Sequence, residues 1–436
     1  MVAILQRLQS RGIYFPVPCD EGSQAWVFKQ KISQKGIKFF QYLVGNHQAL
    51  NIEYSVHCAQ LAHDLVRKNT IELTQQIEAA LMMAELLETI YSDYLIVPRE
   101  VIRLRQEQAV YRSMLEHQKY TFASAEHNDV VDTHLTKNIR ERTAPINWSR
   151  LLTGRIRRFL ILTTPVISDA GYTSWITGAD VYVSPVLNHA SWLVFIPRLS
   201  TNLFLTAKHV FSGSWMGEKE KALGWQIRLK AQLQRRWFEI ANDLAAMTVN
   251  IINCFILIGA LSPFGLYATT ALLIFDVLNA CLRVYIEIGR LKTLEQQHQN
   301  ILMAGDLSIE DREHTKEFLS HLRQRIYYEE KRLYIQVALI TTVFLTFALT
   351  FPLFAVIPII PMIGALLAII ATIGYFTATQ RVDHEKPADK VTPAVAKKAI
   401  LASYGFFKPS LEAASDVVPV PENTSTEDTP LTLLTM

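Results

Sequence analysis

The sequence lacks most of the signatures that would assign it a chemistry. Four cysteines occur in 436 residues, and none forms a CxxC pair, which argues against a disulfide framework and against a zinc ribbon. The 17 glycines include no GxSxG, no GxGxxG and no phosphate-cradling loop, so an enzyme with a known motif is disfavoured. The formal net charge of +3 is too small to indicate nucleic-acid binding by itself.

Metal and targeting signals are also missing. Histidine and aspartate occur in loose groups around His57 and around His127, but neither group has a recognised metal spacing such as HExxH. We therefore predict no metal and no cofactor, and we favour a binding protein over an enzyme. The N-terminus has no basic segment followed by a long apolar core, so we expect no cleavable signal peptide.

Two uninterrupted apolar stretches dominate the rest of the chain. Residues 244–282 contain one formal charge, Asp276, and residues 333–380 contain none. Each stretch is about twice the ~20 residues that an α-helix needs to cross a bilayer. Each also has turn residues near its middle, around Pro263 in the first and around Pro358 in the second. The sequence therefore predicts two transmembrane helical hairpins.

These hairpins divide a chain that we expect to be all-α, a helical integral membrane protein. The six predicted regions are a soluble helical domain at 1–147, a Trp/Arg-rich interfacial region at 148–242, hairpin 1 at 243–282, a coiled-coil stalk at 283–332, hairpin 2 at 333–380, and a basic juxtamembrane segment with a disordered tail at 381–436. In the tail, residues 391–407 could form a short basic helix on the membrane. From Pro409 onward the chain is rich in Pro, Ser, Thr and Glu, which is typical of disorder.

Helical spacing supports the soluble domain and the stalk. Between residues 71 and 95 the apolar side chains recur at helical intervals, and the opposite face carries glutamates. The apolar positions are Leu73, Ile77, Leu81, Ala84, Leu87 and Tyr91, and the polar ones are Glu72, Gln76, Glu85 and Glu88. In the stalk, the repeating positions are Leu291, Leu294, His298, Ile301, Leu319, Leu322, Ile326 and Leu333. They predict an antiparallel coiled coil, roughly 30 Å long.

The Trp/Arg-rich region combines amphipathic rings with basic side chains, as the headgroup layer favours. The predicted interfacial anchors are Trp148, Trp175, Trp192, Trp215, Trp225, Trp237, Arg157, Arg158, Arg235 and Arg236. Two shorter apolar patches, 159–167 and 181–197, contain prolines, so we favour interfacial or re-entrant segments. An ordinary aromatic-rich globular domain is an equally open alternative, and full spanning of one patch is open as well.

Basic residues flank both apolar stretches, whereas the two turns inside them hold no charge. The flanking residues are Arg228, Lys230, Arg235, Arg236, Arg283, Arg290, Lys292, Arg323, Arg325, Lys331, Arg332, Arg381, Lys386, Lys390, Lys397 and Lys398. By the positive-inside rule, both termini and the stalk share the cytosolic side, and only the two turns reach across.

Asp276 is the sharpest single residue, because an acid at mid-membrane depth usually faces a partner or a wet cavity. Counting back from the turn at 263–265 brings two asparagines to about the same depth. The predicted intramembrane polar cluster comprises Asn250, Asn253, Asp276 and Asn279. It could be an ion or proton site, but we favour interhelical hydrogen bonds that lock the hairpin, worth ~0.6–2 kcal/mol each. The second apolar stretch offers only threonines, which weakens a transporter interpretation.

Three runs of the sequence carry a resemblance. The runs NWSRLL at 147–152, PVLNHASWLVFIPRL at 185–199 and NLFL at 202–205 are similar to stretches of uncharacterised multi-spanning membrane proteins of Legionella and Coxiella. Many of those proteins are candidate substrates of a type IV secretion system, so the resemblance implies a secreted effector. It covers the middle of the chain and the hairpins, not residues 1–145, and it carries over no functional residues. The polar C-terminus suits a translocation signal, although its acids are spread out rather than grouped.

Three hypotheses follow for function. The first is a membrane-anchored interaction or scaffold protein, which contacts the lipid bilayer and an unknown protein partner at a host membrane. The second is a small-solute or ion transporter built around Asp276. The third is a membrane-interface enzyme with its site near 189–198. Small residues repeat in the second stretch at Gly364, Ala368, Gly374 and Ala378. They favour intrachain packing and leave a homo-oligomer open.

Overall fold

The computed structural model describes residues 16–19, 24–68, 73–123, 134–303, 309–351, 354 and 356–403. Within these ranges the chain is almost entirely helical, and its two strands, β1 (Ala25–Trp26) and β2 (Thr121–Phe122), are two residues long and pair in parallel. The predicted all-α fold is therefore confirmed. The tail from Pro409 onward, predicted to be disordered, lies outside the described residues.

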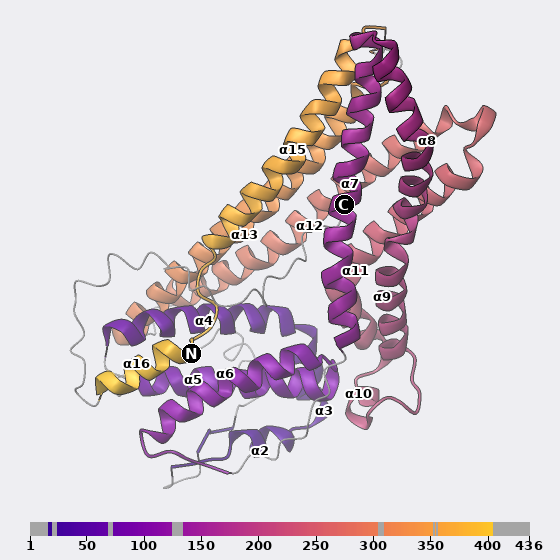
Figure 1. Ribbon diagram of the computed structural model, residues 1–436. Coiled ribbons are helices and arrows are strands. Elements are labelled where there is room, and N and C mark those ends of the chain that lie inside the picture. Colours follow the sequence, from indigo (N-terminus) through magenta and orange to yellow (C-terminus); the bar gives the residue numbers. More distant parts are fainter. Residues whose placement is uncertain are drawn as a thin grey trace.

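An N-terminal helical domain occupies the lower left of Figure 1. Its elements are α2 (Phe28–Ser33), α3 (Ile37–Gly45), α4 (His47–Arg67), α5 (Thr74–Thr89), the π-helical turn η2 (Ile90–Tyr94) and α6 (Pro98–Glu116). One apolar core joins them, and all the apolar positions predicted between residues 71 and 95 are buried in it. Pro98 starts α6, in the first turn, where a missing N–H costs no helical hydrogen bond.

The predicted polar face of α5 is not a solvent-facing surface. Glu85 and Glu88 are buried, because each carboxylate meets several donors inside the domain. Glu85 accepts from Trp26 Nε1 at 3.0 Å and from Arg112 Nη2 at 2.8 Å. The donors to Glu88 are Lys29 Nζ at 2.7 Å, Arg105 Nε at 2.8 Å and Gln108 Nε2 at 3.0 Å. Apolar spacing cannot reveal such compensation, so the sequence pattern overestimated the exposed face.

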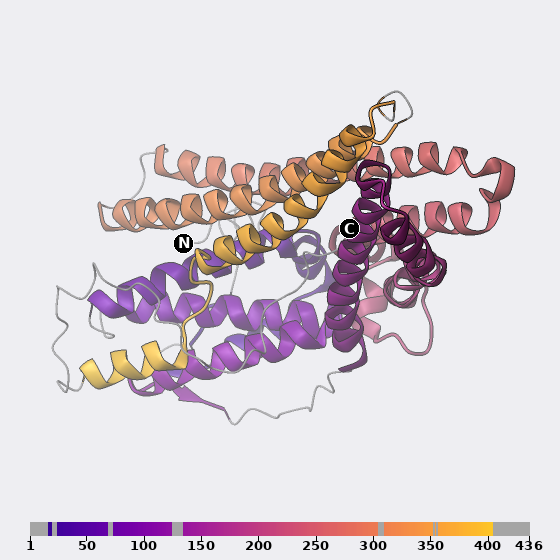
Figure 2. The same ribbon diagram turned by 45° about the horizontal axis from the view of Figure 1, so that its top comes forward.

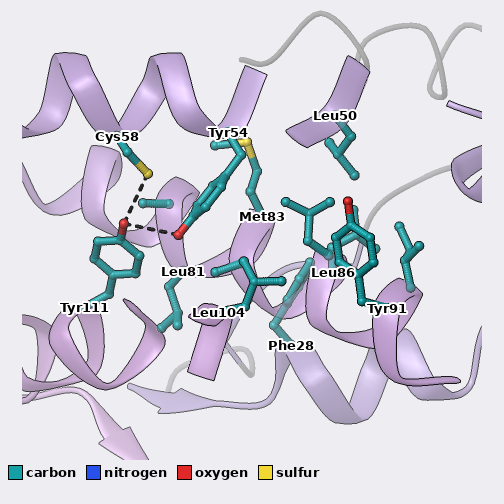
Figure 3. Close-up of a cluster of buried hydrophobic side chains, with 14 of the residues drawn as sticks. Phe28, Leu50, Tyr54, Cys58, Leu81, Met83, Leu86, Tyr91, Leu104 and Tyr111 are labelled. Atoms are coloured by element: carbon teal, nitrogen blue, oxygen red, sulfur yellow. Dashed lines mark hydrogen bonds between the residues drawn. The ribbon is translucent and has the colours of Figure 1, made fainter. Parts of the chain in front are cut away.

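Tyrosine hydroxyls also reach the centre of this core (Figure 3). Tyr54 donates to Glu107 over 2.5 Å and lies 3.2 Å from the Tyr111 hydroxyl, which is 3.1 Å from Cys58 Sγ. Burial raises the pKa of the Cys58 thiol to about 12, so this cysteine stays protonated and unreactive near neutral pH. The network satisfies buried polar groups and holds α4 against α6.

The last described helix, α16 (Pro393–Ser403), returns to the N-terminal domain (Figure 2). It packs against α4 and α6, and Val391, Ala396 and Ala399 are buried in the domain core. Residues 391–403 are the described part of the segment 391–407, which we predicted as a basic helix on the membrane. They use an apolar face to complete the domain, and Lys397 and Lys398 stay exposed on the other face. The domain therefore consists of two segments that residues 134–384 separate in the sequence.

The Trp/Arg-rich region forms long helices rather than short interrupted patches. They are α7 (His134–Ile167), α8 (Ala170–Leu193), α9 (Phe195–Val210), the short α10 (Glu218–Ala222) and α11 (Trp225–Ile251). Pro165 and Pro185 lie inside α7 and α8 without ending them. Asp169 caps α8, where its Oδ1 accepts from Tyr172 N at 2.6 Å. α7 and α8 pack against each other, so the apolar patches predicted at 159–167 and 181–197 lie on neighbouring helices.

Each long apolar stretch folds back on itself. The first contains the end of α11, the π-helical turn η3 (Ile252–Ile256), the 3-10 turn η4 (Gly259–Leu261) and the start of α12 (Phe264–Met303). The second contains the end of α13 (Ile309–Ala348) and α15 (Ile359–His384). By length and composition, two helices of the described chain, Asp311–Ala348 and Ile359–His384, are long and apolar enough to cross a membrane.

The stalk is a pair of antiparallel helices, formed by the parts of α12 and α13 within 283–332 (Figure 2). The predicted spacing holds, since the buried apolar residues between them include Leu291, Leu294, Leu319, Leu322, Ile326 and Leu333. Val56 of α4 packs into the same cluster, and His298 Nε2 lies 3.5 Å from Glu53 Oε1. The N-terminal domain is therefore attached to the stalk along α4.

Candidate functional site

A polar cavity of about 430 Å³ lies where the N-terminal domain, α11 and the stalk meet. We call it the junction pocket. Its lining residues are His47, Gln48, Asn51, Ile52, Tyr91, Glu100, Arg235, Arg236, Glu239 and Arg290. They come from α4, η2, α6, α11 and α12, so the pocket exists only when these elements are assembled. Its volume falls in the range of small-molecule sites, roughly 300–1,000 Å³.

Contacts between elements hold the walls of the junction pocket. Gln48 Nε2 donates to Gln234 O over 3.2 Å, which ties α4 to α11. His47 stands at the first position of α4, and its Nδ1 lies 2.7 Å from Val44 O. Its ring meets Tyr91 edge-on, with ring centroids 6.1 Å apart. These contacts fix the imidazole at the inner wall of the pocket.

The basic groups set the electrostatics of the junction pocket. Burial lowers the pKa of His47 to about 4, and the nearby Arg235 and Arg290 also lower it. The imidazole is therefore neutral at neutral pH. Burial lowers the pKa of Arg290 as well, but a guanidinium remains charged at any physiological pH. A neutral histidine beside charged arginines indicates a positive potential inside the pocket.

The two acids of the pocket are already engaged by other groups. Glu100 accepts from Arg103 Nε at 2.9 Å, on the same helix. Glu239 accepts from Asn202 Nδ2 at 2.9 Å, from α9. The pocket is lined by three arginines, Arg235, Arg236 and Arg290, and by these two glutamates, so basic groups outnumber acidic ones. Guanidinium groups in such a setting can hold a phosphate or a carboxylate by charge-assisted hydrogen bonds.

The predicted arginine anchors face protein rather than open surface. Arg235 and Arg236 line the junction pocket, and Arg236 is buried and donates to Gln232. Arg157 pairs with Asp180 and so joins α7 to α8. Arg158 lies over an aromatic ring of α13. Their spacing in the sequence marks a basic region, but the helices turn each of them toward a different partner.

The six predicted tryptophan anchors divide into two groups. The exposed ones are Trp175, Trp215 and Trp225. The partly buried ones are Trp148, Trp192 and Trp237. Trp148 packs against Phe376 of α15, and Trp192 against Phe255 of η3, with ring centroids 5.6 and 5.8 Å apart. Membrane anchoring stays a prediction for the exposed group, and the other group helps to pack the helices.

Asn250 and Asn253 do not reach the depth that we predicted for them. Asn253 Nδ2 donates to Thr269 Oγ1 at 3.2 Å, while Asn250 Nδ2 donates to its own helix at Ala246 O, 2.7 Å away. The turns η3 and η4 take up several residues before α12 begins. Asn253 therefore lies level with Thr269, nearer the end of the hairpin than Asp276. Counting from Pro263 assumed a tighter turn.

Asp276 and Asn279 stay apart from these asparagines. Within the described chain, no hydrogen bond joins any two of the four predicted cluster residues. Asp276 Oδ1 and Asn279 Nδ2 are buried and have no hydrogen-bond partner among the described groups. The polar cluster is thus a pair of unsatisfied groups on α12 and a separate contact near the hairpin turn.

The region 189–198, our candidate for a membrane-interface active site, spreads its polar groups over separate contacts. His189 Nδ1 lies 3.6 Å from Cys254 Sγ of η3. Arg198 forms a buried ion pair with Asp243 of α11, with Nε 2.6 Å from Oδ2. Arg198 is therefore engaged in holding α9 against α11, so it is not available at a shared site with the histidine.

Sequence reasoning did not find the junction pocket as a site. In the sequence, Arg290 contributed only as one of the basic residues that predict the orientation of the chain in a membrane. His47 belonged to no motif. Nearly 190 residues separate His47 from Arg235 in the chain, so only the folded arrangement brings them together. The excess of arginine before the first apolar stretch was the one local signal.

Neither similarity to known proteins nor a metal site among the described residues indicates what the protein does. Comparison of the chain with protein-family models, with curated proteins and with solved structures found no match. The resemblance to membrane proteins of Legionella and Coxiella therefore stays a prediction. In the part of the chain that the structure describes, no group of three or more His, Cys, Asp or Glu is arranged to hold a metal.

Proposed function

We propose that this protein is a membrane-anchored interaction protein, a helical scaffold that holds its N-terminal domain against a bilayer and binds an anionic lipid headgroup there. In this proposal the hairpins at 243–282 and 333–380 both cross the membrane. The coiled-coil stalk and both chain ends lie on the cytosolic side, as the flanking charges predict. A secreted effector at a host membrane is the setting that the resemblance favours.

The junction pocket is the observation that carries the proposal. Arg235 and Arg290 stand on either side of the first predicted hairpin, each about 12 Å along its helix from the predicted edge of the hydrocarbon at the rise of an α-helix. Polar headgroups occupy the layer next to that edge. Arginines near this layer attract anionic lipids, and a pocket of about 430 Å³ has room for a headgroup.

Lipid retention by the full chain tests this. We would place the protein in nanodiscs of neutral lipid with and without an anionic phospholipid, and count retained lipids by native mass spectrometry. We expect selective retention of the anionic lipid and a higher thermal midpoint in its presence. Arg290→Gln should reduce both effects.

Arg323→Gln is the matched control, since Arg323 lies on the exposed side of the stalk and pairs with Glu295. Retention should be unchanged in that variant. Equal retention of anionic and neutral lipid, or an Arg290→Gln variant that behaves like the wild type, would refute headgroup binding at the junction pocket.

The proposed topology has its own test. We would replace the four native cysteines by serine and introduce Phe264→Cys at the hairpin turn or Lys292→Cys on the stalk. Both positions are exposed on the protein. A membrane-impermeant maleimide should label the two variants from opposite sides of sealed vesicles. Labelling of both from one side contradicts the predicted crossing of the first hairpin.

A second function, passage of a small solute or ion, is favoured by the buried and unsatisfied Oδ1 of Asp276. Proteoliposomes with the wild type should then show a flux that Asp276→Leu removes while the protein still inserts. No flux in the wild type, or an unchanged flux in the variant, would dismiss this function.

A further inference from the structure

Two arginines of α7 face the second apolar hairpin. Arg155 Nη1 donates to Thr372 Oγ1 of α15. The guanidinium of Arg158 lies over the ring of Phe347 in α13, 4.7 Å from its centroid. α7 packs closely against α15, and this packing holds both side chains at the contact. The sequence placed no ionisable residue beside the threonines of this hairpin. In the structure Thr372 contacts Arg155, and Thr346 and Thr350 line a cavity together with both arginines.

A small cavity of about 70 Å³ lies between these arginines and the hairpin. We call it the arginine cavity. Its other lining residues are Val343, Thr346, Phe347, Thr350, Gly364, Ala365 and Ala368. α13 and α15 approach closely here because Gly364 has no side chain. A Cβ at this position would lie 2.9 Å from Thr346 O. The volume holds about two water molecules, so it suits a monatomic ion better than a phosphate ester.

No acid balances the arginine cavity. Its described lining contains no carboxylate, and neither Arg155 nor Arg158 forms an ion pair with a described residue. The nearby threonine hydroxyls cannot supply the missing charge, since they are neutral and donate their protons to backbone carbonyls of their own helices. These threonines are Thr346, Thr350 and Thr372. Arg155 and Arg158 are partly buried, and removing a cation from water beside apolar side chains without a counter-charge is costly.

Arg157 lies on another side of the same helix and, unlike Arg155 and Arg158, pairs with an acid. It turns toward α8, where Nη2 lies 3.0 Å from Asp180 Oδ2 and also 3.0 Å from Ser184 Oγ. A carboxylate of the chain satisfies this arginine. The counter-charge for the arginine cavity has to come from outside the described chain.

We propose that the arginine cavity binds a small monovalent anion of the halide class, which the N–H groups of Arg155 and Arg158 hold against α13 and α15. The anion neutralises the two guanidinium groups and allows α7 to pack on the second hairpin. The size of the cavity excludes larger oxyanions from the same position.

Halide-dependent stability of the purified full chain tests this. We would titrate sodium bromide or sodium chloride against sodium gluconate at constant ionic strength and follow the thermal midpoint in detergent. The midpoint should rise and saturate with halide, and the line width of ³⁵Cl in NMR should report exchange with the protein. Arg158→Gln should weaken halide affinity on the order of tenfold to a hundredfold, as expected for loss of a charge-assisted hydrogen bond.

Arg157→Gln is the matched control, because it removes an arginine from the same helix outside the cavity and should leave halide affinity unchanged. If Arg158→Gln does not fold, Arg158→Lys keeps the charge with fewer fixed donors, and it should fold with reduced affinity. Three results would each overturn the proposal: a wild type indifferent to halide, equal stabilisation by sulfate or phosphate, or an equal loss in Arg157→Gln.

Discussion

The N-terminal domain and the apolar helices that follow it, α7 to α15, differ in how their charged side chains are satisfied. In the domain, Glu85 and Glu88 each accept several hydrogen bonds from basic and polar side chains. In the apolar helices, Arg155 and Arg158 are partly buried and meet no acid within the described chain, and Asp276 Oδ1 has no hydrogen-bond partner there. In the first region, other side chains of the chain thus satisfy the charged groups. In the second region, no described side chain pairs with these charged groups.

This difference separates structural from functional candidates. A buried charge whose hydrogen-bond and ion-pair partners all belong to the chain needs no ligand, because these partners offset the free-energy cost of its desolvation. A buried charge without such a partner indicates an ion, a ligand or a lipid that the chain alone does not provide. For this reason the arginine cavity and Asp276 are candidate sites, and the glutamates of α5 are not.

The largest effect of a single substitution should follow from removing one of the buried glutamates of the domain. Glu85→Ala removes the acceptor of Trp26 Nε1 and the only carboxylate among the described groups that pairs with Arg112, which keeps Gln108 Oε1. We expect a loss of about 3–5 kcal/mol in the free energy of unfolding, the usual cost of removing one partner of a buried pair. A urea titration of the full chain in detergent, followed by circular dichroism, measures it. Glu116→Ala, at an exposed position of α6, should stay within about 0.5 kcal/mol of the wild type, and an equal loss in both would contradict the assignment.

A second effect should appear as a pH dependence of the domain. Burial lowers the pKa of His47 and of His57 to about 4, below the ordinary value of 6.5. Between these values the unfolded chain binds protons that the folded domain does not. Stability should therefore be complete above about pH 6.5 and fall as the pH drops toward 4, by about 1.4 kcal/mol per pH unit for each histidine. Urea midpoints at several pH values check the slope.

His57→Gln isolates one of the two histidines. The difference between its curve and that of the wild type cancels other titrating groups, such as Glu85, whose pKa burial raises. We expect about half of the slope to disappear between pH 6.5 and 4. An identical slope in the variant would mean that His57 is not held neutral by the fold.

A third effect concerns the close approach of α13 and α15. Gly364→Ala puts a Cβ 2.9 Å from Thr346 O and 3.1 Å from Leu349 Cβ, so α13 and α15 have to separate. We expect a loss of about 1–3 kcal/mol, as for other overpacked sites, visible as a lower thermal midpoint in nanodiscs. Gly374→Ala, on the same helix with nothing within 4 Å, should leave the midpoint unchanged. A loss of equal size at Gly374 would show that helix packing is not the cause.

Apolar spacing was sufficient to predict much of the fold. The buried positions of α5 and of the stalk follow from helical periodicity alone, because these helices bury one apolar stripe against a neighbour. The second apolar stretch likewise contains helices long and apolar enough to span a bilayer. Such features depend on local sequence, so a single chain reveals them.

The sites depend on contacts that periodicity does not contain. α16 completes a domain that begins more than 300 residues earlier in the chain, and its apolar face gave no indication of which surface it covers. The position of Asn253 opposite Thr269 depends on a π-helical turn, which no residue type in the sequence predicts. Arg158 could be assigned to the bilayer surface or to a helix contact on composition alone, and only the packing of α7 on α13 and α15 distinguishes them.

The smallest effect in water should come from the ion pair of Arg157 and Asp180, which both keep 29% of their side-chain surface exposed. A double-mutant cycle of Arg157→Gln and Asp180→Asn in detergent should give a coupling of about 1 kcal/mol or less, as for other solvent-accessible pairs. α7 contacts α13 and α15 at this level through Arg155 and Arg158, so in nanodiscs the pair should lose water. Coulomb attraction grows as water is removed, and the coupling should then exceed its value in detergent. A coupling that stays the same would favour α7 and α8 at the bilayer surface, as the prolines of this region first suggested. An increase would favour burial of α7 and α8 in the bilayer, as a third hairpin beside the two that we propose.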